Sequence, residues 1–76
     1  MIPKGTLDGI KRYVEDRIPP GDFLTAVLEN NLRESFNQAD EENRKALFEI
    51  VCHCYNALPF ICWGSPGKVK NWLLDV

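Results

Sequence analysis

The strongest hydrophobic pattern in the chain runs from Asp40 to Leu58. One apolar stripe recurs at helical spacing, at i, i+3, i+4, i+7 and i+11: Leu47, Ile50, Val51, Cys54 and Leu58. A second apolar stripe lies beside it: Phe48, Cys52 and Tyr55. The pattern predicts one helix over residues 40–58, which Asp40 caps. Because so much of its circumference is apolar, we expect this helix to lie centrally, with neighbours on at least two sides.

The N-terminal region predicts a shorter amphipathic helix. Its apolar positions recur at i, i+3, i+7 and i+11: Leu7, Ile10, Val14 and Ile18. Thr6 is the expected N-cap, and Pro19-Pro20 end the helix because a residue that precedes proline is disfavoured in the α region. Gly9 within the helix either permits a close helix contact or lets the first turn fray.

Residues 22–38 allow two interpretations. A helix opens at Gly21-Asp22 with Phe23, Leu24, Val27 and Leu28 as its apolar face, and i+4 spacing continues to positions 32 and 36. That spacing would give one helix to Gln38. Asn31 followed by Glu34, however, has the arrangement of a capping box, and asparagine tolerates a left-handed helix end. We therefore favour two short helices at an angle.

The C-terminal part predicts an apolar connector and a last helix. Leu58-Pro59 ends the preceding helix, and residues 60–63 must pack back on the core, for which an extended conformation is one option. Ser65 and Pro66 suit the N-cap and N1 positions. The inner face of the last helix comprises Val69, Trp72, Leu73 and Val76. With no alternating strand pattern, the sequence predicts a compact all-α domain over residues 1–76, with four or five short helices around the central one.

Composition and charge limit the classes of function. Nine Lys and Arg against eleven Asp and Glu give a net charge of −2, which argues against a nucleic-acid partner because such proteins normally carry a basic excess. No segment approaches the ~18 apolar residues of a membrane span. The first residues lack the apolar core of a signal peptide. We therefore expect a cytoplasmic protein without a membrane partner.

The three cysteines predict free thiols and no metal site. On a helix, Cys52 and Cys54 point about 160° apart, so they neither pair nor converge on zinc with Cys62 and the single histidine, His53. His53 is also poorly placed to activate a neighbouring thiol. The carboxylate pairs Glu15-Asp16 and Glu41-Glu42 lie on expected exposed faces. We expect no catalytic residues, no metal and no cofactor, and hence no enzyme.

The segment from Trp63 to Lys68 is the best candidate for binding. It joins a large aromatic side chain to a capped helix start, where free N–H groups favour a nucleotide phosphate or a partner's carboxylate. The alternative is that Trp63 fills the core and Ser65 only caps the helix. Tryptophan and arginine often anchor protein interfaces. The candidate partner-binding or anion-binding residues are Trp63, Ser65, Gly67, Lys68, Tyr13, Arg17 and Arg33.

Nearly the full length of the chain resembles a known group of proteins. The matching segments are residues 13–15, 18–24 and 26–30, then Ala39-Asp40, Asn43-Arg44, Ile50-Val51, Tyr55-Asn56 and Pro59, and finally Cys62-Trp63-Gly64-Ser65-Pro66, Lys68-Val69 and Trp72-Leu73. This pattern resembles short uncharacterised proteins of tailed bacteriophages and prophages. The group brings no catalytic residues to transfer. Cys52 and Cys54 depart from its pattern, which further weakens any metal interpretation.

The resemblance implies a setting in a phage-infected host cell. Small acidic phage proteins without an active site tend to act by binding, often by blocking a host defence or a host enzyme. The resulting hypothesis is a phage accessory protein that blocks a host macromolecule, such as a CRISPR effector of antiviral defence. Two alternatives remain: a sponge that sequesters a nucleotide second messenger, as a homo-oligomer, and a small helical DNA-binding regulator.

Overall fold

The computed structural model describes residues 1–74, and these residues form helices without a strand. They contain six α-helices and one 3₁₀ helix: α1 (Lys4–Asp16), α2 (Asp22–Leu28), α3 (Leu32–Gln38), α4 (Glu41–Lys45), α5 (Leu47–Ala57), η1 (Phe60–Cys62) and α6 (Pro66–Leu74). The prediction of a small all-α domain is confirmed. No helix within these residues is long and apolar enough to cross a lipid bilayer.

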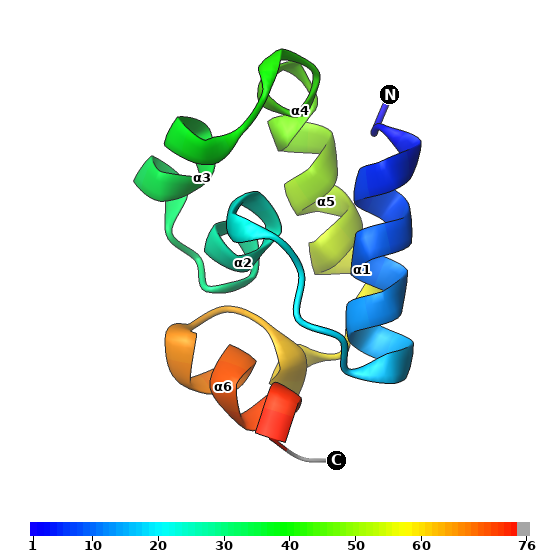
Figure 1. Cartoon of the computed structure of the whole chain (residues 1–76), viewed down its shortest axis with the longest axis vertical. Coiled ribbons are helices and arrows are strands. Elements are labelled where there is room, and N and C mark those ends of the chain that lie inside the picture. Colours follow the sequence, from blue (N-terminus) through cyan, green and yellow to red (C-terminus); the bar gives the residue numbers. More distant parts are fainter. Residues whose placement is uncertain (75–76) are drawn as a thin grey trace.

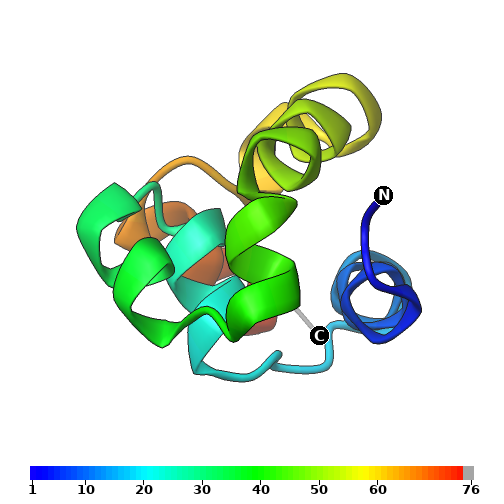
Figure 2. The same cartoon turned by 90° about the horizontal axis from the view of Figure 1, so that it is seen from above.

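Helix α2 occupies the middle of the molecule, with α1, α3 and α6 packed against it (Figure 1). Most of its residues are buried: Leu24, Ala26, Val27 and Leu28. The core continues to Ile10 and Tyr13 of α1 and to Ile50 and Cys54 of α5. In the view from above, α5 lies toward one edge (Figure 2). The apolar pattern predicts this central position for the segment 40–58, and that prediction is wrong, because α2 occupies it.

The segment 40–58 is helical, as expected, but it forms two helices. Asp40 caps α4 by accepting a hydrogen bond from the Asn43 N–H at 2.8 Å. At Ala46 the backbone leaves helical geometry, with φ −95° and ψ 5°, and α5 begins at the next residue. The second apolar stripe is largely uncovered, because Phe48 is 80% and Tyr55 77% exposed. The few other helices of so short a chain do not cover both stripes.

Helix α1 begins earlier and faces the core differently than predicted. It starts at Lys4, so Thr6 lies inside the helix and donates a hydrogen bond to Asn43 Oδ1 at 2.6 Å instead of acting as N-cap. The buried face is Thr6, Gly9, Ile10 and Tyr13, whereas Leu7 and Ile18 are exposed. Gly9 permits a close helix contact: a Cβ there would lie 2.9 Å from Leu24 Cδ1.

The break between α2 and α3 is confirmed. Asn30 takes the left-handed conformation with φ 63°, and the Asn31 side chain accepts a hydrogen bond from the Glu34 N–H at 3.2 Å. This bond satisfies one of the N–H groups that a helix start leaves without a backbone partner. The side chains at 32 and 36 remain exposed, so the i+4 spacing through this region did not report a buried face.

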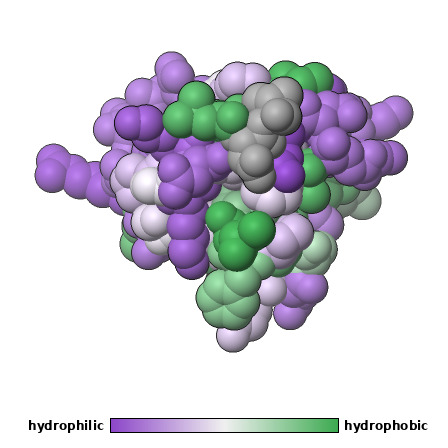
Figure 3. Space-filling view, turned by 90° about the horizontal axis from the view of Figure 1, so that it is seen from below, coloured by the Kyte–Doolittle hydropathy of each residue, from purple (hydrophilic) through white to green (hydrophobic). Residues whose placement is uncertain are grey.

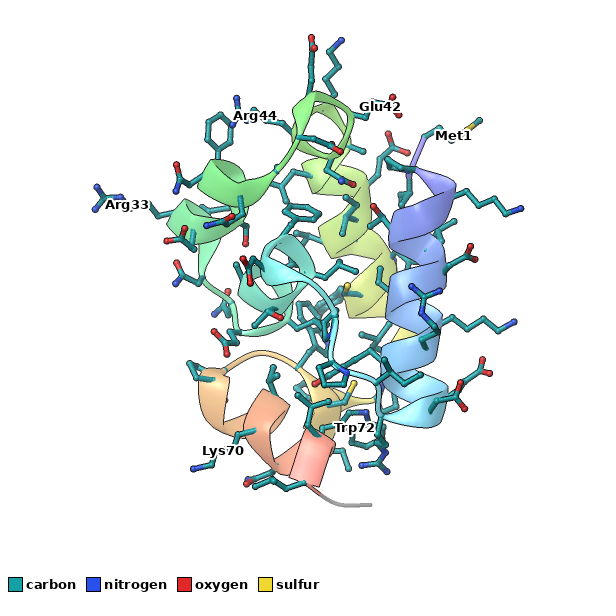
Figure 4. The ribbon with its side chains drawn as sticks, in the orientation of Figure 1. Met1, Arg33, Glu42, Arg44, Lys70 and Trp72 are labelled. Atoms are coloured by element: carbon teal, nitrogen blue, oxygen red, sulfur yellow. The ribbon has the colours of Figure 1, made fainter. Side chains whose placement is uncertain are left out.

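The C-terminal part of the chain is tied to α1 through Tyr13. The Tyr13 hydroxyl donates a buried hydrogen bond to the Cys62 carbonyl oxygen at 2.6 Å, and the Trp72 indole N–H donates to the Tyr13 carbonyl oxygen at 3.0 Å. The Arg17 guanidinium stacks 3.3 Å from the centre of the Trp72 ring. Trp72 lies below the end of α1 (Figure 4). Val69 is buried as predicted, and the predicted contact of Val76 lies outside the described residues.

Replacing Tyr13 by Phe tests this tie. The substitution leaves the buried Cys62 carbonyl oxygen without its donor, which should lower the free energy of unfolding by about 1–3 kcal/mol. Urea denaturation would measure the loss. Tyr55→Phe is the matched control, because the Tyr55 side chain is exposed and should be insensitive to the change. Equal stability of both variants would contradict the structural importance of the bond.

Stability should fall in alkaline solution. Burial raises the pKa of the Cys54 thiol from 9.0 to about 12 and also raises the pKa of the Tyr13 hydroxyl. The unfolded chain ionises first, so unfolding releases protons and the stabilisation, complete at neutral pH, is lost as the pH rises from about 9 toward 12. Each of these two groups lowers the free energy of unfolding by at most about 1.4 kcal/mol per pH unit. Urea titrations at several alkaline pH values should show this fall, with a shallower slope for Cys54→Ala.

Candidate functional site

A groove runs over the side of the molecule between α5 and the junction of α2 and α3. It consists of two adjoining hollows, of about 140 Å³ and about 400 Å³, that share Asn30 and Trp63 in their linings. One wall is a single face of α5 and its C-cap, with side chains at i, i+4, i+8 and i+11: Leu47, Val51, Tyr55 and Leu58. Because one helix face lines both hollows, we treat them as one site, the Trp63 groove.

The rest of the Trp63 groove comes from two parts of the chain, residues 27–35 and residues 60–68. The opposite wall belongs to α2, α3 and the turn between them: Val27, Asn30, Asn31, Leu32 and Ser35. Phe60, Gly64 and Lys68 line the end that α6 and η1 provide. The groove thus collects residues separated by up to 41 positions, from Val27 to Lys68, through tertiary packing.

Trp63 is held in the groove by the residue that follows it. The Gly64 N–H donates a hydrogen bond of 2.7 Å to the Leu28 carbonyl oxygen at the C-terminus of α2. Gly64 has φ +116°, a conformation that strongly favours glycine. Ser65 then caps α6, because its Oγ accepts a hydrogen bond from the Lys68 N–H at 3.2 Å, and Pro66 opens the helix as predicted. Of the connector at 60–63, residues Phe60–Cys62 form the 3₁₀ helix η1, and Trp63 itself is extended, with φ −155° and ψ 165°.

Several large apolar side chains along the groove are exposed to solvent. Tyr55 is 77%, Phe60 83% and Leu32 70% exposed, whereas Trp63 is half-buried. Isolated exposed hydrophobic residues are ordinary, but adjoining ones around a hollow mark a binding surface. Seen from below, the surface shows apolar side chains among hydrophilic ones (Figure 3).

Lys68 is the one charged side chain among the lining residues of the groove. Its Nζ lies 5.2 Å from the centre of the Phe60 ring, and its side chain is half-buried. Among residues 1–74, no carboxylate forms an ion pair with Lys68. The groove therefore combines an apolar lining with one positive charge at its α6 end.

A separate hollow, of about 600 Å³, is lined by residues of α3, including Arg33, and by Arg44 of α4. Apart from Arg33, which is exposed, its charged groups are already engaged. The Arg44 guanidinium donates to the Phe36 carbonyl oxygen at 3.1 Å and stacks 4.5 Å from the centre of the Phe36 ring. Glu34 accepts hydrogen bonds from Asn37 and Gln38. These internal bonds leave little for a ligand, so the smaller but apolar Trp63 groove is the better candidate.

The structure brings together part of the predicted site. Trp63 and Lys68 line the same groove, Ser65 caps the helix beside them, and Gly67 is exposed in the first turn of α6. Trp63 is therefore neither a fully buried plug nor a fully exposed anchor.

The other three predicted residues lie elsewhere. Tyr13 is completely buried, which contradicts its prediction as a partner-binding residue: its hydroxyl is used inside the core. Arg17 is held against Trp72 and donates to the Trp72 carbonyl oxygen at 2.9 Å. Arg33 projects away from the body of the molecule, on α3 (Figure 4).

The three thiols differ in how deeply they are buried. Cys54 and Cys62 are completely buried and Cys52 is half-buried, and none of them forms a disulfide within residues 1–74. Burial raises the pKa of the Cys62 thiol as well as that of Cys54. Within the same residues, no three His, Cys, Asp or Glu side chains are arranged to hold a metal ion.

The groove wall on α5 and the exposed Phe60 are not among the candidate residues that the sequence indicates. Three of the four wall residues, Leu47, Val51 and Leu58, belong to the first apolar stripe, which was expected to be buried. The signals that the sequence did offer were Tyr55 of the second stripe and the aromatic residue after Pro59. A chain of 76 residues has few helices to cover a helix that is apolar on two faces. Surplus apolar surface on such a helix is therefore an indication of a binding face.

No family model matches the sequence, and no curated protein or solved structure matches the chain.

Gly64 and Gly67 provide a matched test of how the groove is built. Gly64→Ala should lower the free energy of unfolding by about 1–2 kcal/mol, because a Cβ is strained at positive φ. Gly67→Ala, three residues away on α6, meets only ordinary contacts and should be neutral or stabilising by up to about 1 kcal/mol. Thermal unfolding of the two variants measures both effects, and a harmless Gly64→Ala would contradict this geometry.

Proposed function

We propose that the protein is a non-enzymatic binding protein that covers a surface of a host protein through the Trp63 groove. The observation that carries the proposal is the exposure of Tyr55 and Phe60 beside the half-buried Trp63. Tyrosine and tryptophan are prominent among the residues that dominate binding energy at protein interfaces. Each large aromatic side chain contributes roughly 150–250 Å² of contact area, so these three side chains supply a large part of the about 800 Å² that a standard interface buries per partner.

The proposed mechanism is steric. A groove lined by side chains from five elements presents a preformed surface, which reduces the ordering cost of binding. A partner segment seated there would bring the body of this domain over the neighbouring surface of the target. Blocking requires no bond to be made or broken, consistent with a lining in which Lys68 is the only charged group.

The resemblance to short phage proteins supplies the proposed setting. In this setting the protein acts in the cytoplasm of an infected bacterial cell, and its target is a component of host antiviral defence, such as a CRISPR effector. The net charge of −2 supports a protein target over nucleic acid.

A second candidate is sequestration of a nucleotide messenger. The larger hollow of the groove combines Tyr55, Phe60 and Trp63, on which a base could stack, with Lys68 for a phosphate. Calorimetry against cyclic and linear nucleotides tests this candidate. Saturable binding that Lys68→Met abolishes would favour the sponge over the protein-binding function.

The main proposal predicts a partner that depends on the groove. The tagged chain should capture a stoichiometric host protein from bacterial lysate after crosslinking, and the double substitution Tyr55→Ala, Phe60→Ala should reduce capture at least about tenfold by removing two anchors. Phe48→Ala is the matched control, because Phe48 is an equally exposed aromatic of α5 outside the groove lining.

The captured protein should also lose its own activity when the chain is added, since the mechanism is blocking. Failure to retain any protein, or capture that the double variant leaves unchanged, would overturn the proposal. Circular dichroism of each variant should show unchanged helix content, so that loss of capture reports the surface.

A further inference from the structure

We infer that the Trp63 groove accepts an amphipathic helix of the partner, with an apolar stripe and a carboxylate that pairs with Lys68. This inference rests on the proposed function and names the chemistry of the segment that the groove would receive. Its evidence is the shape of the groove, the distribution of apolar side chains along it and its single charge.

The length of the groove suits a short helix. Its α5 wall runs from Leu47 to Leu58, and eleven residues at 1.5 Å per residue correspond to about 16 Å. A partner helix of about three turns matches this length and would place apolar side chains at i, i+4, i+7 and i+11 against the groove.

The character of the walls also favours a helix over an extended peptide. Both long walls are helical, from α5 on one side and from α2 and α3 on the other. Recognition of an extended strand normally uses a free sheet edge, and residues 1–74 contain no strand to provide one. Helices, in contrast, pack their side-chain ridges into the grooves of neighbouring helices.

The charge of the groove identifies the end at which the partner carries its carboxylate. Lys68 lines the hollow that contains Tyr55 and Leu58, not the hollow that contains Leu47. It is half-buried and lacks a carboxylate partner among residues 1–74, while the whole chain has a net charge of −2. An Asp or Glu at that end of the partner helix would pair with Lys68 where neighbouring apolar side chains limit solvent screening.

A helix-forming peptide library tests the inference. Peptides of about 14 residues, randomised on one face, would be displayed and selected on the wild-type chain. The enriched peptides should carry apolar residues at helical spacing and an Asp or Glu at one end. Fluorescence anisotropy should then show that Lys68→Glu weakens their binding at least about tenfold, and that exchanging the acidic residue of the peptide for lysine restores it.

Two further variants separate charge from packing. Lys68→Met keeps the apolar stem and should weaken binding less than Lys68→Glu does. Lys70→Glu changes the charge of an exposed lysine of α6 outside the groove lining and should leave binding unchanged. Helix content and unfolding midpoints of all variants should match those of the wild-type chain.

Several outcomes would overturn the inference. Enrichment of proline-rich peptides, or of apolar helices without an acidic preference, contradicts it. Sedimentation of the chain as a dimer that Tyr55→Lys converts to monomers would assign the groove to a second copy. Host-protein capture that persists in Lys68→Glu would reject the acidic helix but leave the proposed function standing, whereas loss of all capture by the wild-type chain would reject the function itself.

Discussion

The buried hydrogen bond between the Tyr13 hydroxyl and the Cys62 carbonyl oxygen sets the position of the segment that begins at Cys62 and leads into α6. Trp63 follows directly, and the Gly64 N–H bond to the Leu28 carbonyl oxygen fixes it against α2. The Trp72 indole closes the same arrangement by donating to the Tyr13 backbone. The short segment before α6 is therefore held in place by α1 at Cys62 and by α2 at Gly64, and both helices lie far from it in the sequence.

Local signals in the sequence predicted the helix boundaries well where a polar side chain caps a helix start. Asn31, Asp40 and Ser65 each accept a hydrogen bond from an N–H three residues later. Such a bond depends on a few adjacent residues, so the sequence is sufficient to identify it. The same reasoning failed at Thr6, because the preceding Pro3 starts α1 one turn earlier and Thr6 finds its partner in α4.

Burial could not be predicted in the same way, because it depends on which helices are available to cover a face. The sequence predicts Tyr13 as an interface residue, but its side chain lies in the core. Tyr55 belongs to a stripe that was expected to be buried, but its side chain is exposed. The candidate site follows this division. The stretch from Trp63 to Lys68 was recognisable from local chemistry, while its opposing wall on α5 emerged only from tertiary packing.

The unequal burial of the three thiols gives the molecule an internal reporter of its own motions. Alkylating reagents attack thiolates that they can reach, so a maleimide dye would attach first at the half-buried Cys52. Cys54 and Cys62 would react only when the region around Tyr13 opens transiently. The rate of the slow phase of labelling would therefore report how often that region opens, without any engineered probe.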